Sequence, residues 1–308
     1  MGDRQDIRQV PSQSVLKAFN IQTPLQPLSG GRGLCFLAGD IVLRPVDYDI
    51  ETQWLNELLL NLTQLPHANQ EYRIAKPLIS TIPTSSGAEN RFIVDNWSAS
   101  SFLAGKDGPR GKFQELFIAS RAFHRDLKDL ISEPPAFVFW KPDRWAEADR
   151  VTWGEKSLDD VLGVNHDVLK AIKPYLERLE EIKKPIPRDT LKYQMVHADL
   201  SGNVLFDNTN RGLAPAIIDM APYWRPVEFS EAVVVADGLT GYEQGTELIE
   251  LYGTDELRLQ VLVRALYWRI LTFAIQSDLP WLEKHMPNID FERAVRLVIK
   301  VVRRDEKS

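Results

Sequence analysis

The chain has 308 residues, a formal net charge of −6, 44% hydrophobic residues and 26% charged residues. These fractions are typical of a globular protein and exclude fibrous and disordered chains. The length fits one large domain or two lobes, and the acidic balance argues against a nucleic-acid-binding role.

The first 97 residues predict a small, strand-rich domain with one long helix. Two apolar runs on either side of a Gly39-Asp40 turn predict a β-hairpin, and apolar residues at helical spacing predict the helix that follows it. The expected elements are a short helix capped by Ser12 or Ser14, a glycine-rich turn over Ser29–Gly33, strands over Leu34–Leu37 and Ile41–Arg44, a helix over Glu51–Leu62, and strands over Tyr72–Leu78 and Arg91–Asp95.

A loop-like stretch over Asn96–Gly111 leads into a second, larger and mostly helical domain, residues 98–308. Trp140, Trp145 and Trp153 lie in a Pro-rich segment without a clear element. Packing is the simpler interpretation of them, and an aromatic floor for a substrate is the alternative. The expected elements are helices over Lys112–Ile131, His166–Ile182 (kinked or broken at Pro174), Glu228–Leu239, Glu243–Tyr252, Glu256–Ile275 and Phe291–Val302, and strands over Val204–Phe206 and Ala216–Ile218.

The stretch Met195–Asp219 carries the chemistry-bearing side chains. Apolar residues lead into a polar loop with His197, Asp199 and Asn203, and Asp219 follows the second of two short strands. Because Asn203 and Asp219 flank one strand–turn–strand unit, both side chains are expected to reach the mouth of the same cleft. A carboxamide oxygen and a carboxylate suit Mg²⁺, and Asp199 stands where a group that orients an attacking hydroxyl belongs.

This segment, His197-Ala198-Asp199 followed by Asn203 and then by Asp219 after an apolar strand, resembles the catalytic and metal-binding loops of the aminoglycoside-phosphotransferase-like small-molecule kinases. These enzymes are relatives of protein kinases. The resemblance implies an α+β, bilobal protein-kinase-like fold with a small β-rich N-lobe that binds nucleotide and a larger, mostly helical C-lobe. It also implies a phosphotransferase that uses Mg²⁺ and ATP or GTP to phosphorylate a hydroxyl of a small molecule.

The resemblance also implies a role for each residue. Asp199 is the catalytic residue, His197 orients its loop, and Asn203 and Asp219 hold the metal. Arg44 stands where the family has a strand lysine that binds phosphates, and Glu51 and Glu57 are both candidates for its partner. The peptide over Asp95–Ala99 is expected to be the hinge that pairs with the base. The implied nucleotide-binding residues are Gly30, Gly31, Gly33, Arg44, Asn96, Trp97 and Ser98.

Departures from the family pattern motivate a second hypothesis. Asn203 follows Asp199 by four residues where the family has five, and Arg44 replaces the lysine. A nucleotide-binding pseudokinase that acts as a scaffold or regulator is therefore the alternative. A protein kinase is a weaker third hypothesis, because no Ala-Pro-Glu element or activation segment follows Asp219.

A second segment, His124-Arg125-Asp126-Leu127-Lys128, has the letters of a protein-kinase catalytic loop. However, Ile131 stands where an Asn would be required, and the segment continues the helical apolar pattern of its neighbours. We therefore predict a helix here, with Asp126 and the neighbouring charged side chains mostly on its solvated face.

The remaining features of the sequence argue against several classes of site and of protein. Cys35 is the single cysteine, so an intrachain disulfide and a cysteine-based zinc site are excluded. No apolar run approaches the roughly 18 residues of a membrane span, and the polar N-terminus does not read as a signal peptide. We expect a cytoplasmic protein without a membrane or nucleic-acid partner, and the oligomeric state stays open.

Overall fold

The computed structural model describes residues 9–29, 33–68, 70–82, 91–187, 190–275 and 279–305. The chain forms two compact units. Unit 1 comprises Met1–Asp107 and Val204–Asp219, and unit 2 comprises Gly108–Asn203 and Met220–Ser308. The sequence predicts a division between residues 97 and 98, whereas the compact units change at Asp107 and the segment 204–219 returns to unit 1.

Unit 1 contains a four-stranded antiparallel sheet with the order β1-β2-β3-β5. Its strands are β1 (Gln26–Pro27), β2 (Phe36–Ala38), β3 (Ile41–Pro45) and β5 (Trp97–Ser101). The predicted hairpin is confirmed as β2 and β3, whose turn contains Gly39 at a φ of +67°. Strands β3 and β5 pair over five residues, which sets Arg44 opposite Ser98.

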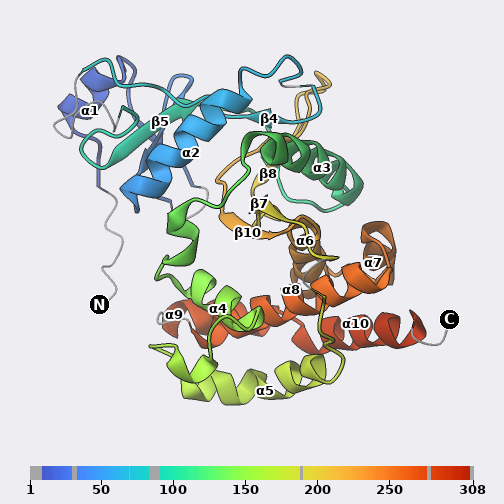
Figure 1. The fold of residues 1–308 in the computed structure, drawn as a ribbon. Coiled ribbons are helices and arrows are strands. Elements are labelled where there is room, and N and C mark those ends of the chain that lie inside the picture. Colours follow the sequence, from blue (N-terminus) through green and yellow to red (C-terminus); the bar gives the residue numbers. More distant parts are fainter. Residues whose placement is uncertain are drawn as a thin grey trace. The chain divides into compact units, whose positions relative to one another are not determined.

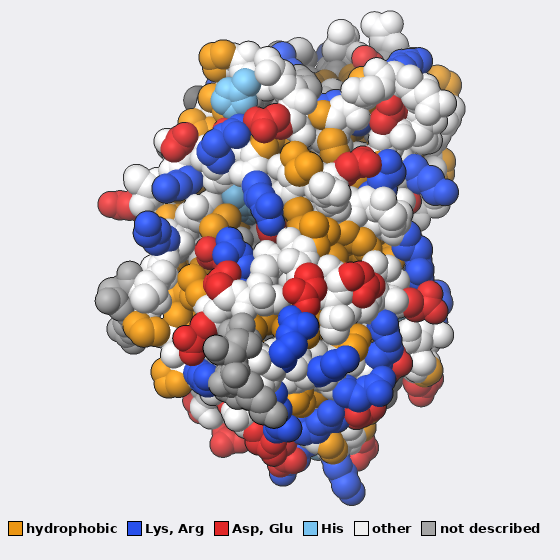
Figure 2. Space-filling view, turned by 90° about the vertical axis from the view of Figure 1, so that its right-hand side faces the viewer, with side chains coloured by type: hydrophobic (Ala, Val, Ile, Leu, Met, Phe, Trp, Pro, Cys, Tyr) orange, Lys and Arg blue, Asp and Glu red, His pale blue; other side chains and the backbone are white. Residues whose placement is uncertain are grey.

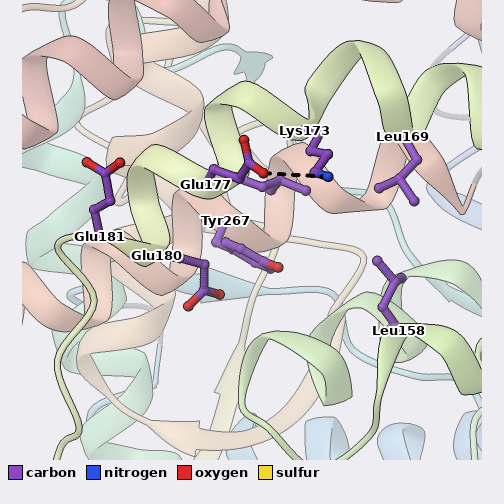
Figure 3. A pocket seen from close by; sticks show the side chains of 8 residues that line it. Leu158, Leu169, Lys173, Glu177, Glu180, Glu181 and Tyr267 are labelled. Carbon is purple, nitrogen blue, oxygen red and sulfur yellow. Dashed lines mark ion pairs between the residues drawn. The ribbon is translucent and has the colours of Figure 1, made fainter.

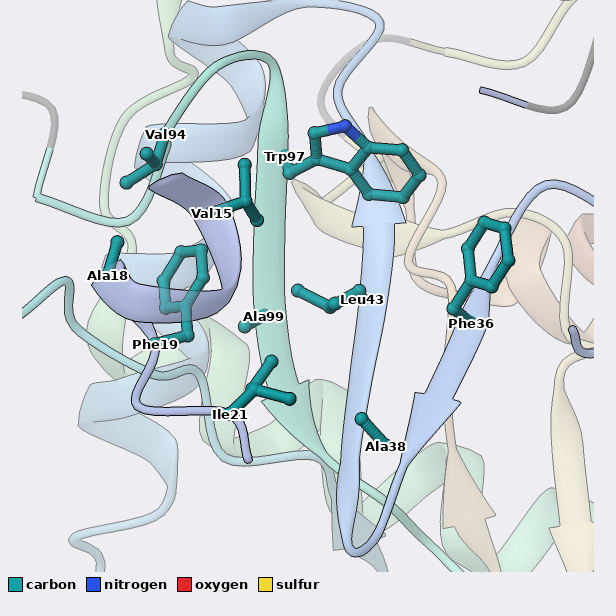
Figure 4. Packing of buried hydrophobic residues seen from close by; sticks show 10 residues of the cluster. All are labelled: Val15, Ala18, Phe19, Ile21, Phe36, Ala38, Leu43, Val94, Trp97 and Ala99. Carbon is teal, nitrogen blue, oxygen red and sulfur yellow. The ribbon is translucent and has the colours of Figure 1, made fainter. Parts of the chain in front are cut away.

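Residues of this sheet and of α1 (Gln13–Ala18) pack together in one hydrophobic core (Figure 4). The helix begins at Ser12, whose side chain accepts a hydrogen bond from the Val15 N–H, as a helix cap does. Leu43 of β3 is fully buried, and the Phe36 and Trp97 rings lie 6.0 Å apart. The core residues are Val15, Ala18, Phe19, Ile21, Phe36, Ala38, Leu43, Val94, Trp97 and Ala99.

A second sheet in unit 1 has the order β4-β9-β8-β6, and α2 (Asp49–Leu62) belongs to the same unit. Its strands are β4 (Arg73–Ile74), β9 (Ala216–Ile217), β8 (Val204–Phe206) and β6 (Lys106–Asp107). The buried Arg73 side chain donates hydrogen bonds to the carbonyl oxygens of Ala214 (2.7 Å) and Ala104 (3.0 Å). This sheet therefore ties the 204–219 segment to residues far away in the sequence.

Unit 2 is mostly helical and has one two-stranded ribbon, β7 (Tyr193–His197) with β10 (Pro222–Pro226). The apolar helix α8 (Glu256–Ala274) contacts α4, α5, α6 and α10, so it forms the centre of this unit (Figure 1). The other helices are α3 (Phe113–Leu130), η2 (Ala136–Phe139), α4 (Arg144–Thr152), η3 (Leu158–Asp160), α5 (His166–Glu180), α6 (Glu228–Gly241), α7 (Thr246–Tyr252), α9 (Leu279–His285), η5 (Met286–Asn288) and α10 (Phe291–Asp305).

The predicted α+β class and all seven longer helices expected from periodicity are confirmed. Helix α5 continues through Pro174 without a break. The expected strand over Arg91–Asp95 is wrong. Val94 and Trp97 instead form a bridge around Asp95 and Asn96, whose φ values of 47° and 62° are those of a tight hairpin turn. The loop expected over Asn96–Gly111 is also wrong, because β5 and β6 lie within it.

The surface is of mixed charge on the face seen in Figure 2, where Lys and Arg side chains are interspersed with Asp and Glu and with hydrophobic side chains. Within the described residues, no helix combines the length and the apolar character that crossing a membrane requires.

Candidate active site

In unit 2 the polar loop starts where strand β7 ends. Met195 and Val196 are fully buried in β7, and His197, its last residue, lies opposite Pro222 of β10. The Ala198 N–H then donates to the Ala221 carbonyl (3.1 Å). Because the ribbon fixes the backbone on both sides, the loop that follows begins from a rigid base.

The His197 imidazole lies inside the turn that it precedes. Its Nδ1 accepts hydrogen bonds from the N–H groups of Asp199 (3.2 Å) and Ala221 (3.4 Å). The Ser230 hydroxyl donates to the His197 carbonyl (2.6 Å), and the residue has no exposed surface. These contacts fit the predicted role of His197 in orienting the loop, which stays a prediction.

A second histidine supports the same strand. His124 Nε2 accepts a hydrogen bond from the His197 N–H (3.0 Å), while His124 Nδ1 lies 2.7 Å from the Ser120 carbonyl. Nδ1 therefore carries the proton and the ring is neutral. Burial lowers the pKa of His124 to about 4.

The kinase-like letters around His124 lie in helix α3, as predicted. The prediction that Asp126 lies on a solvated face is wrong, because the residue is only 3% exposed. The buried face of helix α3 is wider than its large apolar residues indicate, and it also includes the small residues Ala119 and Ala122. This segment does not supply the polar loop, but it packs beneath it through His124.

Asp199 and Asn203 contact each other within the loop. Asn203 Nδ2 donates to the Asp199 carbonyl (2.7 Å) and to Asp199 Oδ2 (3.1 Å). With its amide nitrogen used in this way, Asn203 presents its side-chain carbonyl oxygen as the atom suited to a metal. The four-residue spacing thus closes into a compact turn.

Arg269 of helix α8 lies beside this pair. Its Nη2 is 2.7 Å from Asp199 Oδ1 and 2.8 Å from Asp237 Oδ2. Burial alone would raise the pKa of Asp199, but the Arg269 guanidinium, together with His197 and the hydrogen bond from Asn203, holds that pKa below its ordinary value. The Asp199 side chain is 47% exposed, so it is both charged and accessible.

Neither Arg269 nor Asp237 is among the site residues predicted from the sequence. The signal available was the position of an arginine in the long apolar run of α8, where a charged side chain needs a buried partner. The sequence did not show which partner that was.

Unit 1 brings Arg44 and Asp219 together. Arg44 lies near the end of β3 and Asp219 follows β9, and Arg44 Nη2 is 2.7 Å from Asp219 Oδ1. Both side chains are about half exposed. Asp219 has a φ of +48°, a left-handed conformation that is uncommon outside glycine and is found at functional sites. Of the two glutamates proposed for Arg44, Glu57 accepts a hydrogen bond from Gln53.

The other predicted nucleotide-binding residues are placed as follows. Gly30 and Gly31 lie outside the described residues, and Gly33 has a φ of +70°. Asn96 lies in the tight turn before β5, and Trp97 and Ser98 are buried in β5. The Asn96 carbonyl accepts from the Val46 N–H, and Trp97 exchanges two backbone hydrogen bonds with Val94. These residues are therefore part of the sheet of unit 1 rather than a connection between the units, and their contact with a nucleotide stays a prediction.

The donor atoms fit Mg²⁺. The Asn203 carbonyl oxygen and the Asp219 carboxylate are hard oxygen ligands, and magnesium takes few protein ligands because it keeps waters and phosphate oxygens. The structure describes these two residues in different units, so their assignment to one ion rests on the sequence motif.

A pocket of about 460 Å³ lies elsewhere in unit 2, along α5 and beside Tyr267 of α8 (Figure 3). Lys173 and Glu177 form an ion pair on its wall (3.6 Å). None of the predicted site residues lines this pocket. Of the three tryptophans considered above, Trp145 and Trp153 pack against other aromatic rings, whereas Trp140 is half exposed.

No protein-family model and no curated protein matches the chain. Solved structures do match over almost its full length. Spectinomycin phosphotransferase APH(9)-Ia, in complex with ADP and spectinomycin, aligns with a TM-score of 0.57 at 17% identity, covering 94% of this chain and 96% of that one. The GDP complex of aminoglycoside 2'-phosphotransferase-IIIa aligns with a TM-score of 0.50 at 14% identity, covering 95% and 97%. A choline/ethanolamine kinase family protein from Mesorhizobium loti has a TM-score of 0.44 at 18% identity, covering 91% and 87%. The chain therefore has the kinase-like fold of the aminoglycoside phosphotransferases, as its sequence predicts.

Proposed function

We propose that the protein is a small-molecule kinase that transfers the γ-phosphoryl group of ATP or GTP to a hydroxyl of a small acceptor in the cytoplasm. The observation that carries the proposal is the geometry of Asp199. Its carboxylate is held by Asn203 and Arg269, keeps its charge, and is about half exposed. A carboxylate in that state orients an attacking hydroxyl and accepts its proton.

Asn203 and Asp219 are the proposed ligands of Mg²⁺, which would neutralise charge on the transferred phosphate. Asn203 has its amide nitrogen engaged with Asp199, so its oxygen is the ligand atom. Asp219 keeps one carboxylate oxygen beyond the one that Arg44 contacts. The left-handed backbone of Asp219 supports a functional reason for this residue.

Arg44 is the proposed phosphate-binding cation, together with the glycine turn that contains Gly30, Gly31 and Gly33. A guanidinium binds phosphate oxygens through two parallel N–H groups, so the charge of the family lysine is kept with a different geometry. About half of the Arg44 side chain is exposed and accessible to a ligand. Asn96, Trp97 and Ser98 are the proposed contacts of the base, and backbone pairing holds them within unit 1.

The test is a phosphoryl-transfer assay on the full chain with Mg²⁺ and labelled ATP or GTP. Spectinomycin, choline, ethanolamine and a metabolite extract serve as acceptors. We expect the wild type to phosphorylate at least one acceptor. We expect the Asp199→Asn variant to phosphorylate that acceptor much more slowly. Equal transfer by both proteins would contradict the proposal.

The pseudokinase alternative is separated by a second measurement. A scaffold that binds nucleotide would show a rise in melting temperature with Mg-ATP but no phosphorylated product from any acceptor. The presence of Asp199, Asn203 and Asp219 together favours the enzyme, because each supplies a group that phosphoryl transfer needs.

A further inference from the structure

Arg269 is the charged residue of the apolar second half of α8, residues 265–274. Its side chain is only 11% exposed, and its neighbours Trp268 and Ile270 in α8 are buried. Placing a guanidinium there costs solvation energy, so the side chain needs partners that repay the cost. The identity of those partners indicates what the residue does.

One nitrogen of Arg269 bridges two carboxylates. Nη2 contacts Asp199 Oδ1 at 2.7 Å and Asp237 Oδ2 at 2.8 Å, and the Ser201 hydroxyl donates to the same Asp237 oxygen at 2.7 Å. Asp199 Oδ1 is thereby fixed, while its Oδ2 contacts Asn203. The orientation of the Asp199 carboxylate is thus determined from both sides.

The guanidinium itself is held by aromatic rings. It lies 4.7 Å from the centre of the Trp268 ring and 5.5 Å from that of Trp145. The two rings contact each other edge to face with their centres 6.0 Å apart, and Trp268 Nε1 donates to the Trp145 backbone carbonyl at 2.9 Å. These contacts restrict rotation of the Arg269 side chain, so its guanidinium is held in place beside Asp199.

We infer that Arg269 is a positioning residue for Asp199, bridging it to Asp237 so that the carboxylate keeps the orientation that phosphoryl transfer requires. The inference rests on the proposed function. It distinguishes a role in the rate of transfer from a role in packing alone. Loss of the bridge would leave the Asp199 side chain free to rotate and would leave nucleotide binding intact.

The chain offers a matched control on the same helix. Arg264 is also buried and also lies over a tryptophan ring, that of Trp153, at 5.7 Å. Its guanidinium donates to the backbone carbonyls of Gln260 (2.9 Å) and Lys184 (2.8 Å). Arg264→Met therefore removes a buried cation from α8 without touching the Asp199 bridge.

The experiment measures kcat and the KM for Mg-ATP, using the acceptors named above, for the wild type and for Arg269→Met, Arg269→Lys, Arg264→Met and Asp199→Asn. We expect Arg269→Met to lower kcat by about 10- to 100-fold, with the KM for ATP changed less than about twofold. Arg269→Lys should recover part of kcat, because an ammonium still reaches one carboxylate. Arg264→Met should lower the melting temperature but keep kcat.

A kcat for Arg269→Met within about threefold of that for Arg264→Met would overturn the inference. If Arg269→Met does not fold, Arg269→Gln takes its place. Gln keeps a hydrogen-bond donor for the buried site but lacks the charge, so the same fall in kcat is expected. Transfer that is lost in Asp199→Asn but kept in the Arg269 variants overturns this inference alone. An absence of transfer by the wild type with every acceptor overturns the proposed function and this inference with it.

Discussion

Arg44 Nη2 lies 2.7 Å from Asp219 Oδ1, so the cation that we propose for nucleotide phosphates pairs with the carboxylate that we propose for the metal. Both side chains are about half exposed, and an ion pair of that exposure contributes at most about 1 kcal/mol to stability. A bound nucleotide with Mg²⁺ would offer each partner a stronger contact of opposite charge. The ion pair therefore orients both side chains, and little free energy is needed to separate them when nucleotide and metal bind.

Arg44→Ala should weaken binding of Mg-ATP. A lost charge-assisted hydrogen bond costs about 1.5–3 kcal/mol, and Arg44→Lys should recover part of the affinity because it keeps the charge. Titration calorimetry measures both variants. The exposed Lys17 of α1 supplies a control, and Lys17→Ala should bind as the wild type does. Equal affinities of the wild type and Arg44→Ala would place the phosphate contact elsewhere in the chain.

Asp219 allows separate tests of its side chain and of its backbone. Asp219→Ala and Asp219→Gly should both lose the rise in melting temperature on adding Mg-ATP, because the carboxylate is the proposed ligand. Because φ is +48°, Asp219→Gly should nevertheless be more stable than Asp219→Ala by roughly 0.5–1 kcal/mol. Urea unfolding measures the difference. An undiminished Mg-ATP shift in either variant would rule out Asp219 as a metal ligand.

His124 should make stability depend on pH. Its neutral ring accepts a hydrogen bond from the His197 N–H, and its pKa of about 4 lies below the ordinary value of 6.5. The folded state therefore resists protonation more than the unfolded state. The stability from this group is full above pH 6.5 and is lost as the pH falls from about 6.5 towards 4. Between pH 7.5 and pH 5 the loss is about 2 kcal/mol.

Urea unfolding at the two pH values measures this effect. His124→Gln should unfold more easily at pH 7.5 and should lose about 2 kcal/mol less than the wild type on acidification. His166 begins helix α5 and is exposed, so His166→Gln should keep the slope of the wild type. If His124→Gln shows the same acid loss as the wild type, the buried neutral ring is not the cause.

The sequence predicts the helices well because their apolar faces are continuous, as in α3 and α8. It does not predict β5, whose residues Ser98, Ser100 and Ser101 have no strand preference of their own. That strand forms because β3 pairs with it along its whole length. Tertiary pairing of this kind is not visible in a local pattern.

The candidate site was likewise predictable only in part. The resemblance of the 197–203 loop to the family motif predicts Asp199 and Asn203 as site residues, and the structure places their side chains in contact. Arg269 is 70 positions away from Asp199, and its contact depends on how α8 packs. Long-range partners of a functional residue follow from the fold and not from the motif.

The two candidate catalytic aspartates give the sharpest test of the site. Asp199→Asn keeps the shape of the side chain but removes its charge and basicity, so turnover should fall by roughly 10²–10⁴-fold. Affinity for Mg-ATP should change little, because Asp199 is not a proposed metal ligand. Asp126 lies within helix α3, is 3% exposed and pairs with Arg125 at 3.1 Å. Asp126→Asn should therefore lower the free energy of unfolding by about 1.5–3 kcal/mol and keep the turnover of the folded protein. Steady-state kinetics and urea unfolding on both variants decide the matter, and an inactive but stable Asp126→Asn would show that the wrong aspartate has been assigned to catalysis.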